Sequence, residues 1–168
     1  MGESAGIKNN NVGDGINVNY PFWTFGGDTN KMFEGHIKRS IPFYDEGHEL
    51  IFRLSDFFIS PKSICYDLGC STGTLTIKLF EHNKEKKDIK FIGIEIEENM
   101  VKKALEKAAD LKNVEIIPGD ISVFSYEPAD MFISYYTIQF LLLRPKARQK
   151  MIDTVYRRLN LGGRFYNV

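Results

Sequence analysis

Hydrophobic and polar positions recur with two different periods along the chain, and these periods predict alternating helices and strands. From Tyr44 to Phe58 the apolar residues follow helical spacing, and Pro61 ends the predicted helix. The next run, SICYDL, is apolar enough for a buried strand and leads into a glycine turn. Residues 72–82 then return to helical spacing. We therefore predict a helix, a strand, a tight turn and a second helix in this order.

The second half of the chain continues the same alternation. Strands are predicted at FIGIEI (residues 91–96), VEIIPGD (114–120), MFISYY (131–136) and RFYNV (164–168). Helices are predicted over residues 97–110 and from Pro145 to about Leu159, where NLGG ends the last helix. Strands that are separated by helices favour a parallel sheet with helices on both faces. The fold class is therefore α/β.

Residues 1–19 differ from the rest of the chain in composition. They are rich in Gly and Asn and poor in apolar residues, so we expect a flexible N-terminal tail. An aromatic cluster and a helix over residues 29–39 are expected to follow, and Pro42 interrupts that helix. We assign residues 20–168 to a single domain, which suits a chain of 168 residues.

Charge and cysteine content exclude several classes of function. Lys and Arg number 22, as do Asp and Glu, so the net charge is zero and we expect no direct nucleic-acid binding. We see no signal peptide and no apolar run long enough to cross a membrane, so we expect no membrane partner. Cys65 and Cys70 lack metal-ligand spacing, which favours reduced thiols in a cytoplasmic protein and no metal site.

The stretch from Asp67 to Gly73 is the strongest candidate for chemistry. It follows a predicted strand and opens a helix, and Gly69 would let the backbone turn sharply beside a ligand. The N-terminus of the helix predicted over residues 72–82 offers unpaired N–H groups. A plain turn between a strand and a helix would show the same glycines, so this stretch alone leaves both interpretations open.

Two acidic residues support the ligand interpretation. Glu95 ends the second predicted strand, where a carboxylate commonly accepts the hydroxyls of a ribose. Asp120 ends the third strand, where a side chain can meet the edge of an adenine. Either residue could instead be a solvated strand-end charge or a turn residue. Together with Asp67, however, they fall at the carboxyl ends of three consecutive parallel strands, which predicts a nucleoside-binding site.

DLGCSTG, IGIE and PGDI resemble the first three motifs of class I S-adenosylmethionine-dependent methyltransferases, with Ser71 at the usual middle glycine. HIKRSIPFY, DLGCS and YTIQFL are similar to the narrower family of carboxy-S-adenosylmethionine synthases, from about Tyr20 to the last residue. The resemblance implies a Rossmann-like sheet in the order 3-2-1-4-5, with S-adenosylmethionine as cofactor. It also implies a transferase that makes carboxy-S-adenosylmethionine from S-adenosylmethionine and prephenate, for modification of wobble uridine in tRNA.

The resemblance also assigns roles to individual residues. Those expected to bind the cofactor are Asp67, Gly69, Cys70, Ser71 and Gly73 at the methionine end, Glu95 and Ile96 at the ribose, and Asp120 and Ile121 beside the adenine. Tyr44 and Tyr135 are the catalytic candidates. Tyr44 could instead be a packed aromatic residue, and Tyr135 stands where the family usually has an asparagine.

Two rival functions remain open from the sequence. One is a conventional methyltransferase that acts on a small molecule near Tyr135 and Tyr136, and the other is a non-catalytic binding module. The chain ends in the fifth strand, whereas the resemblance implies further strands. We therefore expect either a fragment or a second chain, such as another copy, that covers the edge of strand five.

Overall fold

The computed structural model describes residues 18–19, 22–23, 35, 37–141 and 144–168, which divide into two compact units at Tyr44/Asp45. In the first unit, β1 (Val18–Asn19) pairs antiparallel with β2 (Phe22–Trp23). Residues 35 and 37–40 are helical, so the described part of the helix predicted over residues 29–39 continues one residue beyond the predicted end. The predicted tail lies outside the described residues, apart from its last two positions.

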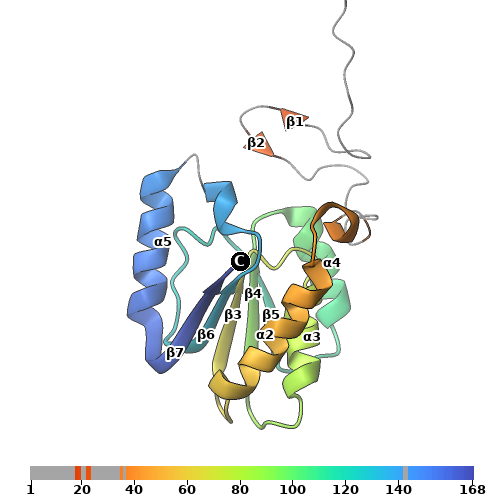
Figure 1. Ribbon diagram of the computed structural model, residues 1–168, viewed down its shortest axis with the longest axis vertical. Helices are drawn as coiled ribbons and strands as arrows, with labels where there is room; N and C mark the ends of the chain where they lie inside the picture. Colours follow the sequence, from red (N-terminus) through yellow and green to blue (C-terminus); the bar gives the residue numbers. More distant parts are fainter. Residues whose placement is uncertain (1–17, 20–21, 24–34, 36, 142–143) are drawn as a thin grey trace, which may run out of the picture. The chain divides into compact units, whose positions relative to one another are not determined.

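The second unit, Asp45–Val168, contains a five-stranded parallel sheet (Figure 1). Its strands are β3 (Ile64–Leu68), β4 (Lys90–Glu95), β5 (Val114–Pro118), β6 (Ala129–Ser134) and β7 (Leu159–Asn167). They lie in the order β5-β4-β3-β6-β7, and every pair of neighbours is parallel. This arrangement confirms the predicted order 3-2-1-4-5.

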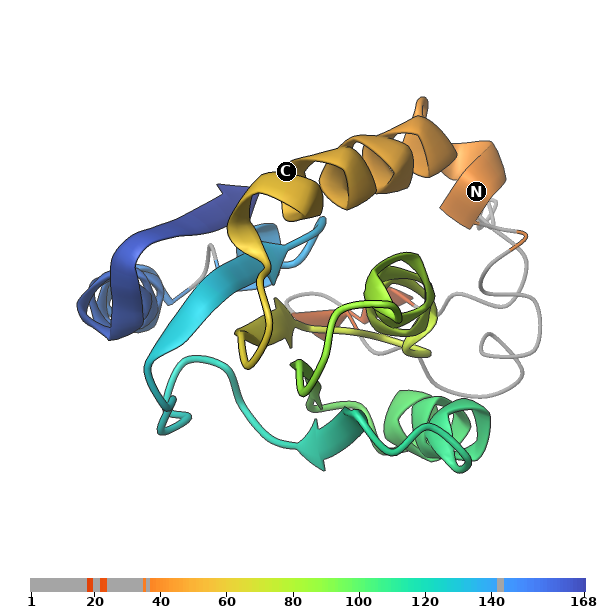
Figure 2. The ribbon, with the colours of Figure 1, turned by 90° about the horizontal axis from the view of Figure 1, so that it is seen from below.

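Helices cover both faces of this sheet, as predicted. They are α2 (Tyr44–Phe58), α3 (Thr74–Asn83), α4 (Glu98–Ala108) and α5 (Pro145–Arg158), with a 3-10 turn η1 (Ile138–Leu141) before α5. Figure 2 shows α2, α3 and α4 on one face and α5 on the other. Among the described residues, no helix is long and apolar enough to span a membrane.

The central strands are buried along nearly their whole length, which is typical of a parallel sheet covered on both faces. On one side, Tyr66 stacks on Phe132 with ring centroids 5.1 Å apart and meets Tyr126 edge-on at 5.3 Å. Met151 and Val155 of α5 complete this core and are fully buried. The rigid strands and the helices packed on them place the strand ends, which carry the candidate site.

Two predicted boundaries differ from the structure. β6 ends at Ser134 rather than at residue 136, and the backbone of Tyr136 has a left-handed φ of 52° that a strand cannot contain. β7 begins at Leu159, directly after α5. Its pairing with β6 jumps from Leu159 to Arg164, so the NLGG stretch forms an irregularity inside the strand rather than a separate loop.

Candidate functional site

The turn from Gly69 to Gly73 joins β3 to α3 and is tied to the end of β4. The backbone N–H groups of Gly69 and Cys70 both donate to the carbonyl of Ile94, at 2.8 and 3.0 Å. Gly69, Ser71 and Gly73 have φ values of 75°, 53° and 74°, so three of the five residues are left-handed. This conformation costs little for glycine but strains the serine.

Thr137, just after β6, closes against the turn. A Cβ added to Gly69 would overlap the Thr137 methyl group, so the backbone can approach this closely only at a glycine. The Thr137 hydroxyl donates to the carbonyls of Tyr135 and Gly69 at 3.1 and 3.4 Å. Sequence reasoning missed this role, although Thr137 opens the TIQFL stretch that carried the family resemblance.

Glu95 brings the end of β4 onto the same turn. Its Oε2 accepts a 2.8 Å hydrogen bond from the N–H of Ser71, and its Oε1 accepts from the N–H groups of Ile96 and Glu97 at 2.8 and 2.9 Å. The residue is 8% exposed. Backbone donors therefore fix the carboxylate between the turn and the start of α4.

Asp120 lies next along the same edge of the sheet. The N–H of the preceding Gly119 donates to the Glu95 carbonyl at 2.8 Å. Asp120 accepts from the N–H of Ser122 at 2.8 Å and pairs with the Arg144 guanidinium at 3.3 Å. Burial raises the pKa of Asp120, but the hydrogen bonds from Ser122 and the charge of Arg144 have the larger, opposite effect. The pKa of Asp120 is therefore lowered overall. Asp120 thus stands ionised and partly exposed.

Asp67 faces the protein interior. It is the fourth residue of β3, is 3% exposed, and accepts a 2.6 Å hydrogen bond from the Thr76 hydroxyl of α3. Burial raises the pKa of Asp67 to about 6, against the lowering effect of the Thr76 hydroxyl, and the nearby charge of Glu95 adds to the rise. The structure therefore places Asp67 beneath the turn, bonded to α3.

The neighbouring candidates divide between interior and surface. Cys70 is buried, and a Cβ on Gly93 would lie 2.7 Å from its Sγ. Burial raises the pKa of this thiol, and the charges of Asp67 and Glu95 raise it further. Ile121 is also buried, whereas Ile96 is 61% exposed beside Glu95. Cys70 would thus meet a ligand through its backbone, and Ile96 through an apolar side chain.

Tyr135 extends from the end of β6 to α2. Its hydroxyl lies against Gly47, where an added Cβ would overlap it, and its ring lies 4.8 Å from the ring of His48. Burial raises the pKa of Tyr135 to about 12, with smaller contributions from Tyr136 and the acidic start of α2. The phenol is therefore protonated at neutral pH and can act as a hydrogen-bond donor but not as a base.

Tyr44 is the first residue of α2 and is half-buried. Its catalytic role remains a prediction.

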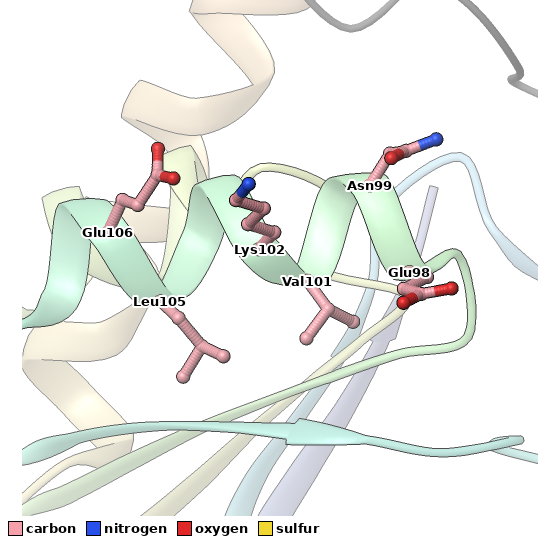
Figure 3. A pocket seen from close by; sticks show the side chains of 6 residues that line it. All are labelled: Glu98, Asn99, Val101, Lys102, Leu105 and Glu106. Atoms are coloured by element: carbon pink, nitrogen blue, oxygen red, sulfur yellow. The ribbon is translucent and has the colours of Figure 1, made fainter.

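A separate hollow runs along α4 and is lined by Glu98, Asn99, Val101, Lys102, Leu105 and Glu106 (Figure 3). Val101 and Leu105 point there toward the side of α4 where β5 lies. This hollow contains none of the predicted ligand-binding residues.

The structure thus gathers most of the predicted site at one edge of the sheet. The turn from Gly69 to Gly73, Glu95 and Asp120 are linked by backbone hydrogen bonds at the carboxyl ends of three adjacent strands. In the part of the chain that the structure describes, no group of three or more His, Cys, Asp or Glu residues could hold a metal ion. The arrangement places two carboxylates, Glu95 and Asp120, beside a turn whose backbone a ligand can approach closely, which suits a nucleoside with a polar tail.

A family model described as "Methyltransferase domain" matches residues 59–167. The chain belongs to this methyltransferase-domain family. Two curated relatives, both named carboxy-S-adenosyl-L-methionine synthase, come from Staphylococcus epidermidis and Campylobacter lari. They are 36% and 34% identical over 88% and 84% of the chain. The chain spans 64% and 58% of the length of these two relatives.

Solved structures of methyltransferases share the fold. The CcbJ methyltransferase from Streptomyces caelestis has a TM-score of 0.66 at 20% identity, over 84% of this chain and 55% of its own. An S-adenosylmethionine-dependent methyltransferase from Clostridium acetobutylicum has a TM-score of 0.65 at 18% identity, over 83% and 57%. The comparisons confirm the predicted superfamily, the similarity to carboxy-S-adenosyl-L-methionine synthases and the fold. At the level of the family they also confirm the transferase class and the S-adenosylmethionine cofactor.

Proposed function

We propose that this methyltransferase domain binds S-adenosylmethionine at the turn from Gly69 to Gly73 and serves carboxy-S-adenosylmethionine synthesis. The observation that carries the proposal is the Glu95 carboxylate, which three backbone N–H groups fix at the end of β4. Its Oε2 accepts only one of these hydrogen bonds, so it retains an acceptor position for a ribose hydroxyl.

The other residues at this edge suit the remaining parts of the ligand. Ile96 exposes an apolar side chain beside Glu95, against which an adenine ring can pack. Asp120 is ionised and partly exposed, and it can accept a hydrogen bond from an exocyclic amine. The left-handed turn keeps the backbone close enough to contact the methionine end without a Cβ in the way.

S-adenosylmethionine would supply the methyl carbon, which would lose a proton and bond to the carboxyl carbon that prephenate, the substrate we propose, gives up. Prephenate would also lose its ring hydroxyl, which would take the proton and leave as water, so that its ring becomes aromatic. The residues of this chain would orient the two reactants and stabilise charge. Tyr135 stays protonated at neutral pH, so its contribution would be a hydrogen bond rather than proton removal. Tyr44 is proposed as the second catalytic residue. We also propose a cytoplasmic location, which the two free cysteines support, and a role in tRNA modification, which the resemblance to the carboxy-S-adenosylmethionine synthase family implies.

Mass spectrometry of the ligand that copurifies with the protein tests the activity. A mass equal to S-adenosylmethionine plus CO2 would support the carboxylating function. Plain S-adenosylmethionine or S-adenosylhomocysteine would favour a conventional methyltransferase, and an empty protein that does not bind added S-adenosylmethionine would favour a non-catalytic module. Incubation with S-adenosylmethionine and prephenate, followed by the same measurement, should yield the carboxylated mass.

The ribose role has its own test. Glu95→Ala removes charge-assisted hydrogen bonds, so titration calorimetry should show at least about tenfold weaker S-adenosylmethionine binding. Glu98→Ala is the matched control, because Glu98 is an exposed glutamate in the first turn of α4. Equal affinity in the Glu95 variant and the wild type would reject the assignment.

We further propose that another strand pairs with β7, from a second copy or another chain. In the described part of the chain β7 is the last strand of the sheet, and Leu161 is fully exposed while Val168 is 47% exposed. An edge with unpaired backbone groups and apolar side chains favours such pairing. Light scattering should then give a mass of at least two chains, and a monomer at micromolar concentration would contradict a homodimer.

A further inference from the structure

One face of α4 lies along the ligand turn and contacts it residue by residue. The Ser71 hydroxyl donates to Met100 Sδ at 3.7 Å. One helical turn later, Ala104 is completely buried against Gly73, where an added Cβ would lie 3.1 Å from the Ala104 Cβ. Met100 and Ala104 are four residues apart, so they lie on the same face of the helix.

Lys107 continues this face by one more turn and supplies its polar contact. Its Nζ donates to the hydroxyl of Thr72 at 3.2 Å and to that of Thr74 at 3.0 Å. Thr72 is buried within the turn, and Thr74 is the first residue of α3. The ammonium group of Lys107 therefore bridges the last part of the turn and the first residue of the helix that follows it.

These contacts surround the part of the turn that contains the strained residue Ser71. Ser71 and Gly73 are both left-handed, and a serine in that conformation persists only when its surroundings hold it there. α4 also begins directly after the segment whose N–H groups bind the Glu95 carboxylate. The same helix therefore links the turn to the proposed ribose-binding residue.

We propose that Met100, Ala104 and Lys107 form a positioning face on α4 that holds the turn in its ligand-binding conformation before the ligand arrives. Lys107 is its polar anchor and acts through Thr72 and Thr74. This inference rests on the proposed binding of S-adenosylmethionine, and it adds a residue that none of the binding motifs contains. A preorganised turn spares the ligand the cost of ordering it, so loss of the anchor weakens binding.

The test compares three variants of the full chain. Lys107→Met removes both hydrogen bonds but keeps the length of the side chain, and Lys107→Arg keeps the donors. Lys102→Met is the control, because Lys102 is an exposed lysine of the same helix, and its ammonium group points away from β5 (Figure 3). Calorimetry with S-adenosylmethionine and amide hydrogen exchange of residues 69–74 in ligand-free protein are measured for each.

We expect Lys107→Met to bind S-adenosylmethionine about three- to tenfold more weakly, with faster exchange of the turn amides. Lys107→Arg should recover most of the affinity, and Lys102→Met should match the wild type in both measurements. Unchanged affinity together with unchanged exchange in Lys107→Met would overturn the inference, as would an equal loss in Lys102→Met. A wild-type protein that binds no S-adenosylmethionine would refute the proposed function instead, and the exchange data would still decide whether Lys107 holds the turn.

Discussion

The backbone N–H of Ser71 donates a 2.8 Å hydrogen bond to Oε2 of Glu95, so one contact joins the glycine turn to the end of the neighbouring strand. The same serine has a φ of 53°, in the left-handed region. Ser71 therefore fixes Glu95, the proposed ribose-binding residue, to the turn and is itself strained. The conformation that positions Glu95 costs the protein stability.

Ser71→Gly should show how much stability the left-handed conformation costs. Glycine removes the left-handed strain and keeps the backbone N–H, so we expect the free energy of unfolding to rise by about 0.5–1 kcal/mol. Chemical denaturation measures this change. Ser71→Val should instead lower stability, because a β-branched residue tolerates a positive φ least. Equal stability of the glycine and valine variants would contradict a left-handed Ser71.

Gly69→Ala should destabilise the protein by more than about 2 kcal/mol, because it adds left-handed strain and an overlap with Thr137. Gly162→Ala is a matched control: its φ is 85°, but nothing lies within 4 Å of an added Cβ, so it bears only the backbone cost. In a Thr137→Ala background the cost of Gly69→Ala should fall toward that of Gly162→Ala. Denaturation of the four variants gives the coupling, and a coupling near zero would exclude the contact.

The effect of Gly47→Ala on stability should also depend on the residue that it contacts, Tyr135. Alanine favours a helix over glycine by about 1 kcal/mol, yet its Cβ would overlap the Tyr135 hydroxyl. We therefore expect Gly47→Ala to destabilise the wild type and to stabilise the Tyr135→Asn variant by up to about 1 kcal/mol. Thermal unfolding of the double-mutant cycle checks this reversal of sign. The same sign in both backgrounds would show that the phenol does not lie over Gly47.

The buried Asp67 predicts a specific dependence of stability on pH. Its pKa is raised to about 6 from an ordinary value of 3.8, mainly by burial, so the folded state binds the proton more tightly than the unfolded state. Its contribution to stability is therefore fully present below about pH 4 and is lost as the pH rises through 6. The loss amounts to about 2–3 kcal/mol.

Asp67→Asn removes this titration and keeps an acceptor for the Thr76 hydroxyl. The stability of the wild type relative to this variant should fall between pH 4 and pH 7 and stay constant above pH 7. Urea denaturation at a series of pH values measures the difference. A difference that rises with pH, or does not change, would contradict a raised pKa of Asp67.

The sequence predicted the fold well because the periodicity of the apolar residues carries most of that information. The predicted helix from Tyr44 to Phe58 matches α2 at both ends, and the order of the five strands is confirmed. The boundary near Tyr136 was wrong because a left-handed residue outside glycine leaves no pattern. The prediction that NLGG ends the last helix before a separate strand was wrong, because an irregularity inside a strand has the same composition as a turn that ends a helix.

The candidate site was predicted as a set of strand ends, and the structure joins most of them. The pattern could not show which side chains face the ligand edge and which face the core. Asp67 turned out to be buried because helices cover both faces of β3, and Ile121 because it packs into the core with Tyr126. The supporting residues Thr137 and Lys107 were missed because they lie at least 64 and 34 residues after the end of the turn, respectively.

The packing of Cys70 over Gly93 has a consequence for covalent probes. Cys70 is 5% exposed, and the pKa of its thiol is raised by burial and by two nearby carboxylates, so little thiolate forms and little of the residue meets solvent. Alkylation of Cys70 thus requires local opening of the fold, even though its backbone borders the proposed cofactor site. Its labelling rate would report how often β3, β4 and α3 separate, and an electrophilic inhibitor aimed at this cysteine would fail against the folded protein.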